Sequence, residues 1–207
     1  MDIVIPLFDD FEPLDAIGPY QMLGHLPGAT VRFVAVGERG AVADGIGGLR
    51  LDVPARYAEV EGCDVLLVPG GRGTRRLLAD DALLDWLRRV HGTTRFTASV
   101  CTGALLLGAA GLLDGLDATT HWAAAGELAA YGAAFTPERV VRRGRIVTAA
   151  GVSAGIDMAL HLAALLTDET TARAIQLHAE YDPVPPFDSG SWAKASPVVR
   201  ERIKDLR

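Results

Sequence analysis

Positive charge in excess is one of several features that this chain of 207 residues lacks. Twenty Lys and Arg stand against 26 Asp and Glu, which gives a formal charge of −6. A protein that binds nucleic acid by neutralising phosphates needs clustered basic residues, so we expect no nucleic-acid partner. The arginine pairs at 75/76, 88/89 and 142/143 are scattered, which favours solvated faces or helix ends.

Cysteine is also scarce, because only Cys63 and Cys101 occur. Two cysteines build no disulfide framework, and we expect both to be reduced thiols in a cytoplasmic protein. Neither has a Cys or His neighbour at the short spacing of zinc ligands. We therefore expect no metal site.

Long apolar runs are missing as well: none approaches the roughly 20 residues that span a bilayer, so no membrane partner is expected. The opening MDIVIPLF has no basic region and is typical of a buried first strand rather than of a signal peptide. Hydrophobic residues make up 49% of the chain and charged residues 22%, enough for a large core. At this length we expect one domain over residues 1–207.

Strand-like and helix-like segments alternate along the chain, which predicts an α/β fold: a three-layer, flavodoxin-like sandwich with a mostly parallel central sheet and helices on both faces. Proline favours the first turn of a helix, so the first helix is expected to begin at Pro19. Ligands bind such sheets outside the carboxyl ends of the strands. The expected strands are 2–8, 30–37, 63–71 and 93–100, with hairpins in 40–53 and 139–151, a short strand and helix in 118–132, and helices to 26 and at 80–91, 102–113, 153–166, 168–180 and 197–207.

Cys101 lies where the strand-like run ending at Val100 gives way to the helix-like run TGALLLGAAGLL. A strand-to-helix elbow of this kind points its side chain out of the sheet edge, and the helix N-terminus lowers the thiol pKa from about 8.5 towards neutrality. Cys101 is therefore either a nucleophile or a small buried hydrophobic residue.

Pro69-Gly70-Gly71 ends the apolar strand CDVLLVPGG. Successive glycines there can aim backbone N–H groups at a ligand, so Gly70 and Gly71 are candidates for an anion hole shared with the N–H of Thr102. The alternative is an ordinary tight turn.

Asp15 and His121 are the candidate ionisable partners of Cys101. Asp15 follows the first strand by a short turn and is either a helix cap or a catalytic group. Beside Cys101, a protonated Asp15 donating to a thiolate would be the favourable arrangement. His121, in TTHW, is either a base or a histidine held by structural hydrogen bonds.

These motifs resemble the ThiJ/PfpI superfamily, whose fold is similar to that of class I glutamine amidotransferase domains. The resemblance rests on LDAIGP, DVLLVPGGRGT, SVCTGALLLGAAGLLDGLDATTHW and TAAGVSAGIDMALHL, and it covers nearly the whole chain. Other branches commonly carry a His after the nucleophilic Cys and a Glu near the first strand, where this chain has Thr102 and Asp15. Those residues and the tail EYDPVPPFDSGS resemble the isocyanide hydratase branch.

The resemblance implies hydration of an isocyanide to an N-substituted formamide through a covalent thioimidate on Cys101. Asp15 would be the acid and base, Thr102 would hold the site and Val152 would form an apolar wall or packing support. It implies no cofactor, isocyanide and water as substrates, and a homodimer. The rivals are glyoxalase-type hydration of a 2-oxoaldehyde and a non-enzymatic thiol sensor or regulator, for which no basic recognition helix is found.

Overall fold

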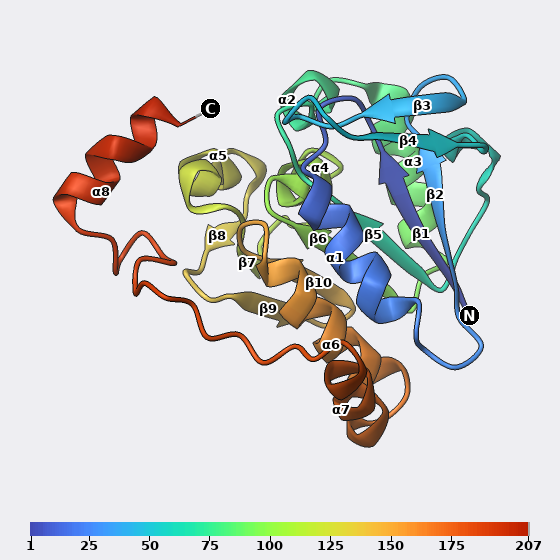
Figure 1. Cartoon of the computed structure of the whole chain (residues 1–207). Helices are drawn as coiled ribbons and strands as arrows, with labels where there is room; N and C mark the ends of the chain where they lie inside the picture. Colours follow the sequence, from blue (N-terminus) through green and yellow to red (C-terminus); the bar gives the residue numbers. More distant parts are fainter. Residues whose placement is uncertain (207) are drawn as a thin grey trace.

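Short runs of apolar and β-branched residues form the central sheet of the computed structural model, which describes residues 1–206. The sheet has six strands in the order β2-β1-β5-β6-β10-β9 (Figure 1). Every residue of β5 and β6 is buried. The continuous apolar run of β5 predicts a strand covered on both faces, whereas β6 also buries the polar side chains of Thr97 and Ser99. The strands are β1 (Asp2–Leu7), β2 (Thr30–Ala35), β5 (Val65–Val68), β6 (Phe96–Val100), β9 (Val140–Arg143) and β10 (Ile146–Ala149).

The strand order creates a crevice at the carboxyl ends of β1 and β5. The chain passes from β1 to β2 on one side and then crosses to β5 on the other side of β1. Neighbouring strands pair in parallel except β9, which is antiparallel to β10 and forms one edge. Loops that leave two adjacent strands in opposite directions open a ligand crevice between them. The loops after β1 and β5 are therefore placed to build a site together.

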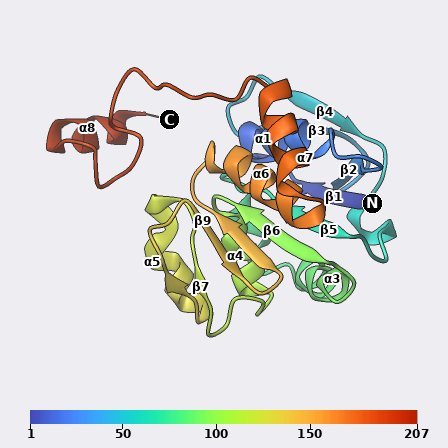
Figure 2. The same ribbon diagram turned by 90° about the horizontal axis from the view of Figure 1, so that it is seen from below.

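Helices cover both faces of the sheet, which confirms the predicted three-layer α/β fold (Figure 2). Asp80 and Asp168 cap α3 and α7 by accepting the N–H groups of Leu83 and Thr171. One face carries α1 (Pro13–Leu23), α6 (Ala154–Leu166) and α7 (Glu169–His178), and the other carries α3 (Asp81–His91) and α4 (Gly103–Ala109). The smaller elements are β3 (Gly40–Ala43), β4 (Arg50–Val53), α2 (Thr74–Leu77), β7 (Asp117–Ala118), α5 (Ala125–Leu128), β8 (Ala134–Phe135) and α8 (Pro197–Arg202).

The first helix begins earlier than predicted. It starts at Pro13, which occupies its first turn, and Pro19 lies inside it. Proline in a helix removes one N–H, so the carbonyl of Asp15, four residues earlier, loses its helical donor. The ring is accommodated because α6 presents Gly155 there: a Cβ on that glycine would lie 3.1 Å from Cγ of Pro19. Pro13 gives the same local signal for a helix start six residues earlier, and the close packing of α1 on α6 accommodates Pro19 inside the helix.

The tail after α7 is the part of the chain that the sequence pattern defined least. Residues 182–196 have little regular structure, and the predicted last helix is α8 followed by a short turn at Ile203–Asp205. The helix was expected to reach residue 207, which lies outside the described residues. In Figure 1 the tail runs outward from α7, and α8 stands apart from the layered body.

No helix within residues 1–206 is long and apolar enough to cross a membrane.

The loop after β5 supplies a test of the fold. Gly71 has φ of 133°, and a Cβ there would lie 2.3 Å from the carbonyl oxygen of Asp10. Gly144, in the β9–β10 turn, has φ of 59° and nothing within 4 Å of a built Cβ. We expect Gly71→Ala to lower the free energy of unfolding by about 3 kcal/mol or more, and Gly144→Ala by about 1 kcal/mol. Urea unfolding measures both, and equal losses would contradict the close approach.

Candidate active site

Cys101 is the first residue after β6, at the predicted elbow. Its φ of 56° lies in the left-handed region, which a side-chain-bearing residue occupies at a cost of about 1–2 kcal/mol. Its N–H donates to the carbonyl oxygens of Ala149 and Ala150 at 3.1 and 3.0 Å. Gly103 lets α4 start at once, because a Cβ there would lie 2.1 Å from the carbonyl oxygen of Val68. The elbow leaves Cys101 only 6% exposed.

Asp15 lies in the first turn of α1 and is completely buried. Its Oδ2 accepts the N–H of Gly70 at 2.8 Å. Its Oδ1 is buried without a hydrogen-bond partner of its own among residues 1–206. The cap position of α1 belongs to Glu12, so Asp15 is not the helix cap that was one of its two predicted roles. The structure brings its carboxyl into the crevice beside Cys101.

The carboxyl of Asp15 is mostly protonated at pH 7. Burial raises its pKa from 3.8 to about 8, and the negative charge of Glu12 acts in the same direction. The hydrogen bond from Gly70 and the interaction with the Cys101 thiol act in the opposite direction but are smaller than the effect of burial. A protonated Asp15 is therefore the ordinary state of the crevice.

The pKa of the Cys101 thiol is raised, whereas the helix N-terminus was expected to lower it. Burial, and then the charge of Asp15, raise the pKa of Cys101 to about 12, whereas hydrogen bonds from the N–H groups of Val152 and Thr102 lower it. The contribution of Asp15 operates only when that carboxyl is ionised. With Asp15 protonated, its contribution disappears, and burial and the negative charge of Glu12 remain to oppose the two backbone donors.

The backbone of Val152 has a role in the site that the sequence did not indicate. Val152 was expected as an apolar wall or packing support, and its side chain does pack against the core. In addition, its N–H is one of the two backbone donors to the sulfur of Cys101. Its φ of 37° is unusual for a β-branched residue. Such strain persists where surrounding packing imposes it, and here it aims an N–H at the thiol.

The hydroxyl of Thr102 is fixed on both sides. Gly71 donates its N–H to Oγ1 of Thr102 at 2.9 Å, and Oγ1 of Thr74 lies 3.0 Å from the same atom. Thr74 is completely buried. Thr74 was not among the predicted site residues, because only the glycines of PGGRGT were. A Thr that follows such glycines at the start of a short helix does indicate a site residue.

Gly70 and Gly71 do not form an anion hole in this structure. Their N–H groups donate to Asp15 and Thr102 and are not available to a ligand. A Cβ on Gly70 would lie 2.6 Å from Oγ1 of Thr102 and 2.9 Å from Oδ2 of Asp15. The two glycines therefore hold the site's side chains, and the backbone donors that face the thiol come from Thr102 and Val152.

His121 lies beside the elbow. A Cβ on Gly151 would meet its ring at 2.5 Å, and the preceding residue Thr120 donates its hydroxyl to the carbonyl of Cys101 at 2.8 Å. Nδ1 of His121 accepts the N–H of Ala123 at 3.2 Å, so the neutral ring carries its proton on Nε2. Burial and the charge of Arg75 lower its pKa. With Nδ1 occupied by that N–H, the neutral ring of His121 presents its Nε2–H as a hydrogen-bond donor.

Arg75 was expected on a solvated face or at a helix end, and it lies half-exposed in the last turn of α2. It is also close enough to His121 and Cys101 for its charge to act on both. Its guanidinium pairs with Glu127 of α5, with Nη2 and Oε1 at 2.5 Å. The pair joins α2 to α5 beside the crevice. Spacing in the sequence gives no indication of this contact.

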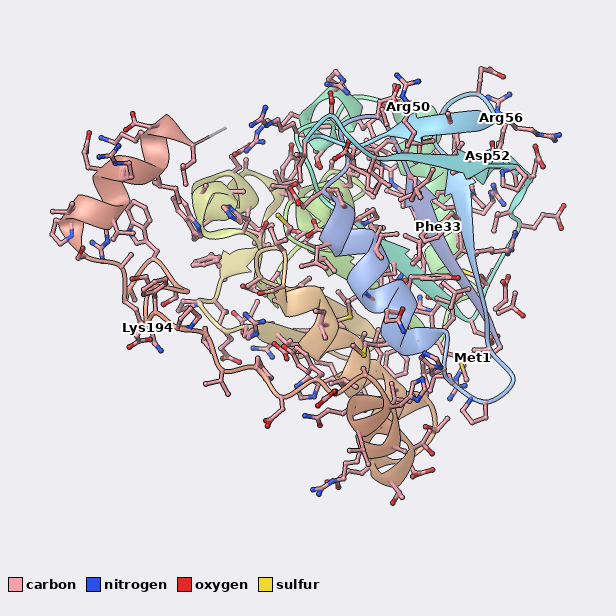
Figure 3. The ribbon with its side chains drawn as sticks, viewed as in Figure 1. Met1, Phe33, Arg50, Asp52, Arg56 and Lys194 are labelled. Carbon is pink, nitrogen blue, oxygen red and sulfur yellow. The ribbon has the colours of Figure 1, made fainter. Side chains whose placement is uncertain are left out.

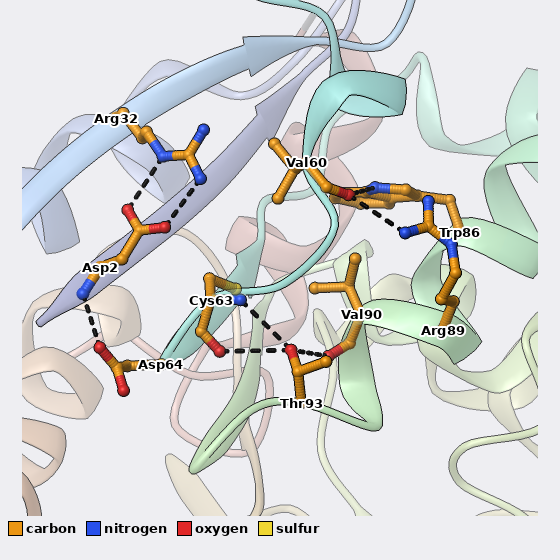
Figure 4. A network of polar contacts seen from close by, with 9 residues as sticks. All are labelled: Asp2, Arg32, Val60, Cys63, Asp64, Trp86, Arg89, Val90 and Thr93. Carbon is orange, nitrogen blue, oxygen red and sulfur yellow. Dashed lines mark hydrogen bonds and ion pairs between the residues drawn. The ribbon is translucent and has the colours of Figure 1, made fainter.

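Cys63, the other thiol, belongs to a structural network at the opposite end of the sheet (Figure 4). Its N–H donates to Oγ1 of Thr93 at 3.2 Å. Burial and the nearby Asp2 raise the pKa of Cys63 to about 12. Within residues 1–206, no three His, Cys, Asp or Glu side chains gather in a way that could hold a metal ion.

The fold and the site together define a doubly wound α/β protein with a cysteine at a nucleophile elbow. The chain belongs to the DJ-1/PfpI family, whose sequence pattern matches residues 1–165.

Two relatives match nearly the whole chain. An isonitrile hydratase from Pseudomonas putida is 44% identical over 199 residues, which are 96% of this chain and 86% of that protein. The crystal structure of a ThiJ/PfpI family protein from Pseudomonas syringae superposes with a TM-score of 0.93 at 38% identity, over 99% of this chain and 85% of that one. The HTH-type transcriptional regulator GbdR of Pseudomonas aeruginosa is 31% identical over 75% of this chain, which is 44% of the regulator.

Burial of Asp15 makes stability depend on pH. Its pKa is 3.8 in the unfolded chain and about 8 in the folded protein, so the folded state binds the extra proton between these values. The contribution of Asp15 to the free energy of unfolding is complete below pH 3.8 and is lost as the pH rises towards 8.

An Asn at position 15 keeps the acceptor for the N–H of Gly70 and carries no charge. We expect Asp15→Asn to raise the free energy of unfolding by roughly 3 kcal/mol at pH 8 and by less than about 1 kcal/mol at pH 4. Denaturant unfolding at both pH values measures this, and destabilisation at pH 8 would contradict the assignment.

The electrostatic coupling between Asp15 and Cys101 can be measured through the rate at which the Cys101 thiol is alkylated. At pH 9 the ionised Asp15 holds back formation of the thiolate, whereas at pH 6 the carboxyl is neutral and does not. We expect Cys101 in Asp15→Asn to be alkylated by iodoacetamide about 3- to 10-fold faster than in the wild type at pH 9 and equally fast at pH 6. Mass spectrometry follows Cys101, with Cys63 as the internal control. A ratio that is the same at both pH values would exclude the coupling.

Proposed function

We propose that this protein is an isocyanide hydratase, which adds water to R–N≡C to give an N-substituted formamide. One observation carries the proposal: the carboxyl of Asp15 is completely buried beside the thiol of Cys101, and burial raises its pKa to about 8. The isocyanide carbon needs a soft nucleophile and then a proton, and these two side chains supply them. The similarity to an isonitrile hydratase over 96% of the chain supports this substrate class.

In the first step the thiolate of Cys101 adds to the terminal carbon and forms a C–S bond. Asp15 donates its proton to the same carbon, which gives a covalent thioimidate, R–N=CH–S–Cys101, and leaves an Asp15 carboxylate. Oδ2 of Asp15 stays bound to Gly70, so the unpartnered Oδ1 is the oxygen free to transfer the proton. The N–H groups of Thr102 and Val152 stabilise the thiolate before it attacks.

In the second step the Asp15 carboxylate takes a proton from water as the oxygen attacks the thioimidate carbon. The proton passes to nitrogen, and the tetrahedral R–NH–CH(OH)–S–Cys101 results. Collapse forms the C=O bond, returns the hydroxyl proton to Asp15 and expels the thiolate, which leaves R–NH–CHO. The atoms balance with isocyanide and water alone, and the enzyme ends with Asp15 protonated, as it began.

Thr102 and His121 have supporting roles in this proposal. Thr102 keeps its hydroxyl on Gly71 and Thr74, which fixes its N–H towards the sulfur. His121 offers a neutral Nε2–H donor beside the elbow. The elbow has Thr102 where a histidine would be needed to activate the thiol for peptide hydrolysis, so the geometry favours addition of water to a small electrophile.

The activity is tested by incubating the protein with cyclohexyl isocyanide and with an aryl isocyanide and measuring the formamide by chromatography. We expect turnover by the wild type, loss to background in Cys101→Ala, and a fall in kcat of at least about 100-fold in Asp15→Asn. The rate should decline as the pH rises through about 8, because Asp15 then loses its proton.

Cys63→Ala is the matched control for loss of a buried thiol and should keep full activity, since Cys63 lies in a separate network. Incubation with methylglyoxal, with lactate as the product measured, distinguishes the glyoxalase-type alternative. Absence of formamide from the wild type, or unchanged turnover in Cys101→Ala, would overturn the proposal. Unchanged turnover in Asp15→Asn would remove Asp15 from the mechanism.

A further inference from the structure

Glu12 carries a carboxyl beside the candidate active site that the proposed mechanism does not use. It occupies the N-cap position of α1, yet its side chain accepts no N–H group of the helix. Within residues 1–206 its carboxylate forms no hydrogen bond and no close ion pair. Burying part of a carboxylate costs hydration, and here no direct contact offsets that cost. The charge of Glu12 therefore acts on its neighbours at a distance rather than through a bond of its own.

The backbone of Gly70 holds Glu12 and Asp15 at the same time. The N–H of Glu12 donates to the carbonyl oxygen of Gly70, and the N–H of Gly70 donates to Oδ2 of Asp15, both at 2.8 Å. The N–H of Asp15 donates in turn to the carbonyl oxygen of Glu12 at 3.1 Å. An N-cap residue and the third residue of a helix lie close together on one side of it. The two carboxyls are thus fixed one turn apart at the same crevice.

The two carboxyls differ in burial, and this decides the order in which they ionise. Asp15 is completely buried, whereas Glu12 is half-buried. Loss of hydration disfavours an ionised carboxyl, so Glu12 loses its proton at a lower pH than Asp15. Once Glu12 is charged, its like charge opposes the ionisation of Asp15. Burial is the largest cause of the raised pKa values of Asp15 and Cys101, and the charge of Glu12 adds to both.

Two other elements bring charges to Glu12. The hairpin of β3 and β4, on which Figure 3 labels the exposed residues Arg50 and Asp52, carries Asp44 at the end of β3. The carboxylate of Asp44 accepts four backbone N–H groups of the loop that follows it, at 2.9–3.2 Å, so its charge is fixed in place. Burial and then the charge of Asp44 raise the pKa of Glu12, whereas Arg72, in the loop after β5, lowers it.

The charged groups on the remaining sides of the crevice are already paired. Arg75 of α2, whose charge reaches Cys101, pairs with Glu127, and Asp157 of α6 pairs with Arg139. Glu12 is therefore the charged side chain through which the protein acts directly on the carboxyl of Asp15.

We propose that Glu12 is a positioning residue of the hydration reaction and acts through Asp15. Its negative charge keeps the proton on Asp15 until the isocyanide carbon accepts it, and afterwards makes the Asp15 carboxylate a stronger base towards water. Glu12 gives up and takes no proton in the cycle, so the balance of each step is unchanged. The inference rests on the proposed function for its reaction, whereas the effect of Glu12 on Asp15 depends on the crevice alone.

Carbon-13 NMR of the side-chain carboxyls tests the effect on Asp15 without substrate. The resonance of Asp15 is identified by its absence from Asp15→Asn, and in the wild type it should titrate with a midpoint near pH 8. In Glu12→Gln, which removes the charge and keeps the size, the midpoint should fall by at least about 0.5 pH units. Glu12→Asp keeps the charge and should stay closer to the wild type.

Asp9→Asn is the matched control for loss of a negative charge. Asp9 lies exposed in the same turn as Glu12, and an Asn there keeps the acceptor for the N–H of Ala43. Because solvent screens the Asp9 carboxylate, this variant should leave the midpoint of Asp15 where it is in the wild type. Circular dichroism monitors folding, and Glu12→Ala is a second variant without the charge.

The pH dependence of formamide production tests the link to the reaction. In Glu12→Gln the decline in rate should move to lower pH with the midpoint of Asp15, so that turnover falls about 3-fold at pH 9 and is unchanged at pH 6. A merely structural role would lower turnover equally at both pH values, and that result would overturn the proposal.

The two measurements separate this inference from the proposed function. An unmoved midpoint of Asp15 in Glu12→Gln, or an equal shift in Asp9→Asn, would overturn the role of Glu12 even if formamide is produced. A shifted midpoint in a protein that makes no formamide would overturn the proposed function and support the effect of Glu12 on Asp15.

Discussion

The hydrogen bond from the N–H of Gly70 to the carboxyl of Asp15 is the contact on which the site depends. It ties α1 to the loop after β5 and thereby places the carboxyl beside the elbow that follows β6. A backbone dipole, unlike an arginine or lysine, satisfies the carboxyl without keeping it ionised, so burial determines its charge. The site therefore holds its proton through desolvation, and the same glycine loop orients Thr102 through the next N–H along the chain.

The sheet and its layers could be predicted from the sequence because their signals are local. Val65–Val68 is a short apolar run followed by a turn, and Phe96–Val100 is a strand-like run followed by an elbow. Both are fully buried parallel strands. The start of α1 could not, because Pro19 is a valid local start signal. Pro13 is an equally valid signal, and the sequence does not show that Gly155, 136 positions beyond Pro19, leaves room for the ring of Pro19 inside the helix.

The position of the site could be predicted from the sequence, whereas the hydrogen bonds within it could not. Cys101 and Asp15 follow strands whose carboxyl ends must meet, so topology brings them together. Which N–H groups remain free depends on sub-ångström packing: Gly71 donates to Thr102, and the strained backbone of Val152 supplies the donor instead. No residue pattern encodes a φ of 37° at a valine. Ion pairs between residues far apart in the sequence, such as Arg75 with Glu127, cannot be predicted from residue spacing either.

The antiparallel strand β9 has a consequence for how the folded protein behaves in a crowded solution. An edge strand with open N–H and C=O groups invites pairing with other chains. Here the edge is only four residues long, and its Arg142 and Arg143 are exposed. Arg142 covers the ring of Phe96 at 5.4 Å, and Arg143 pairs with Asp117. A short edge strand with charged side chains therefore disfavours edge-to-edge aggregation of the sheet.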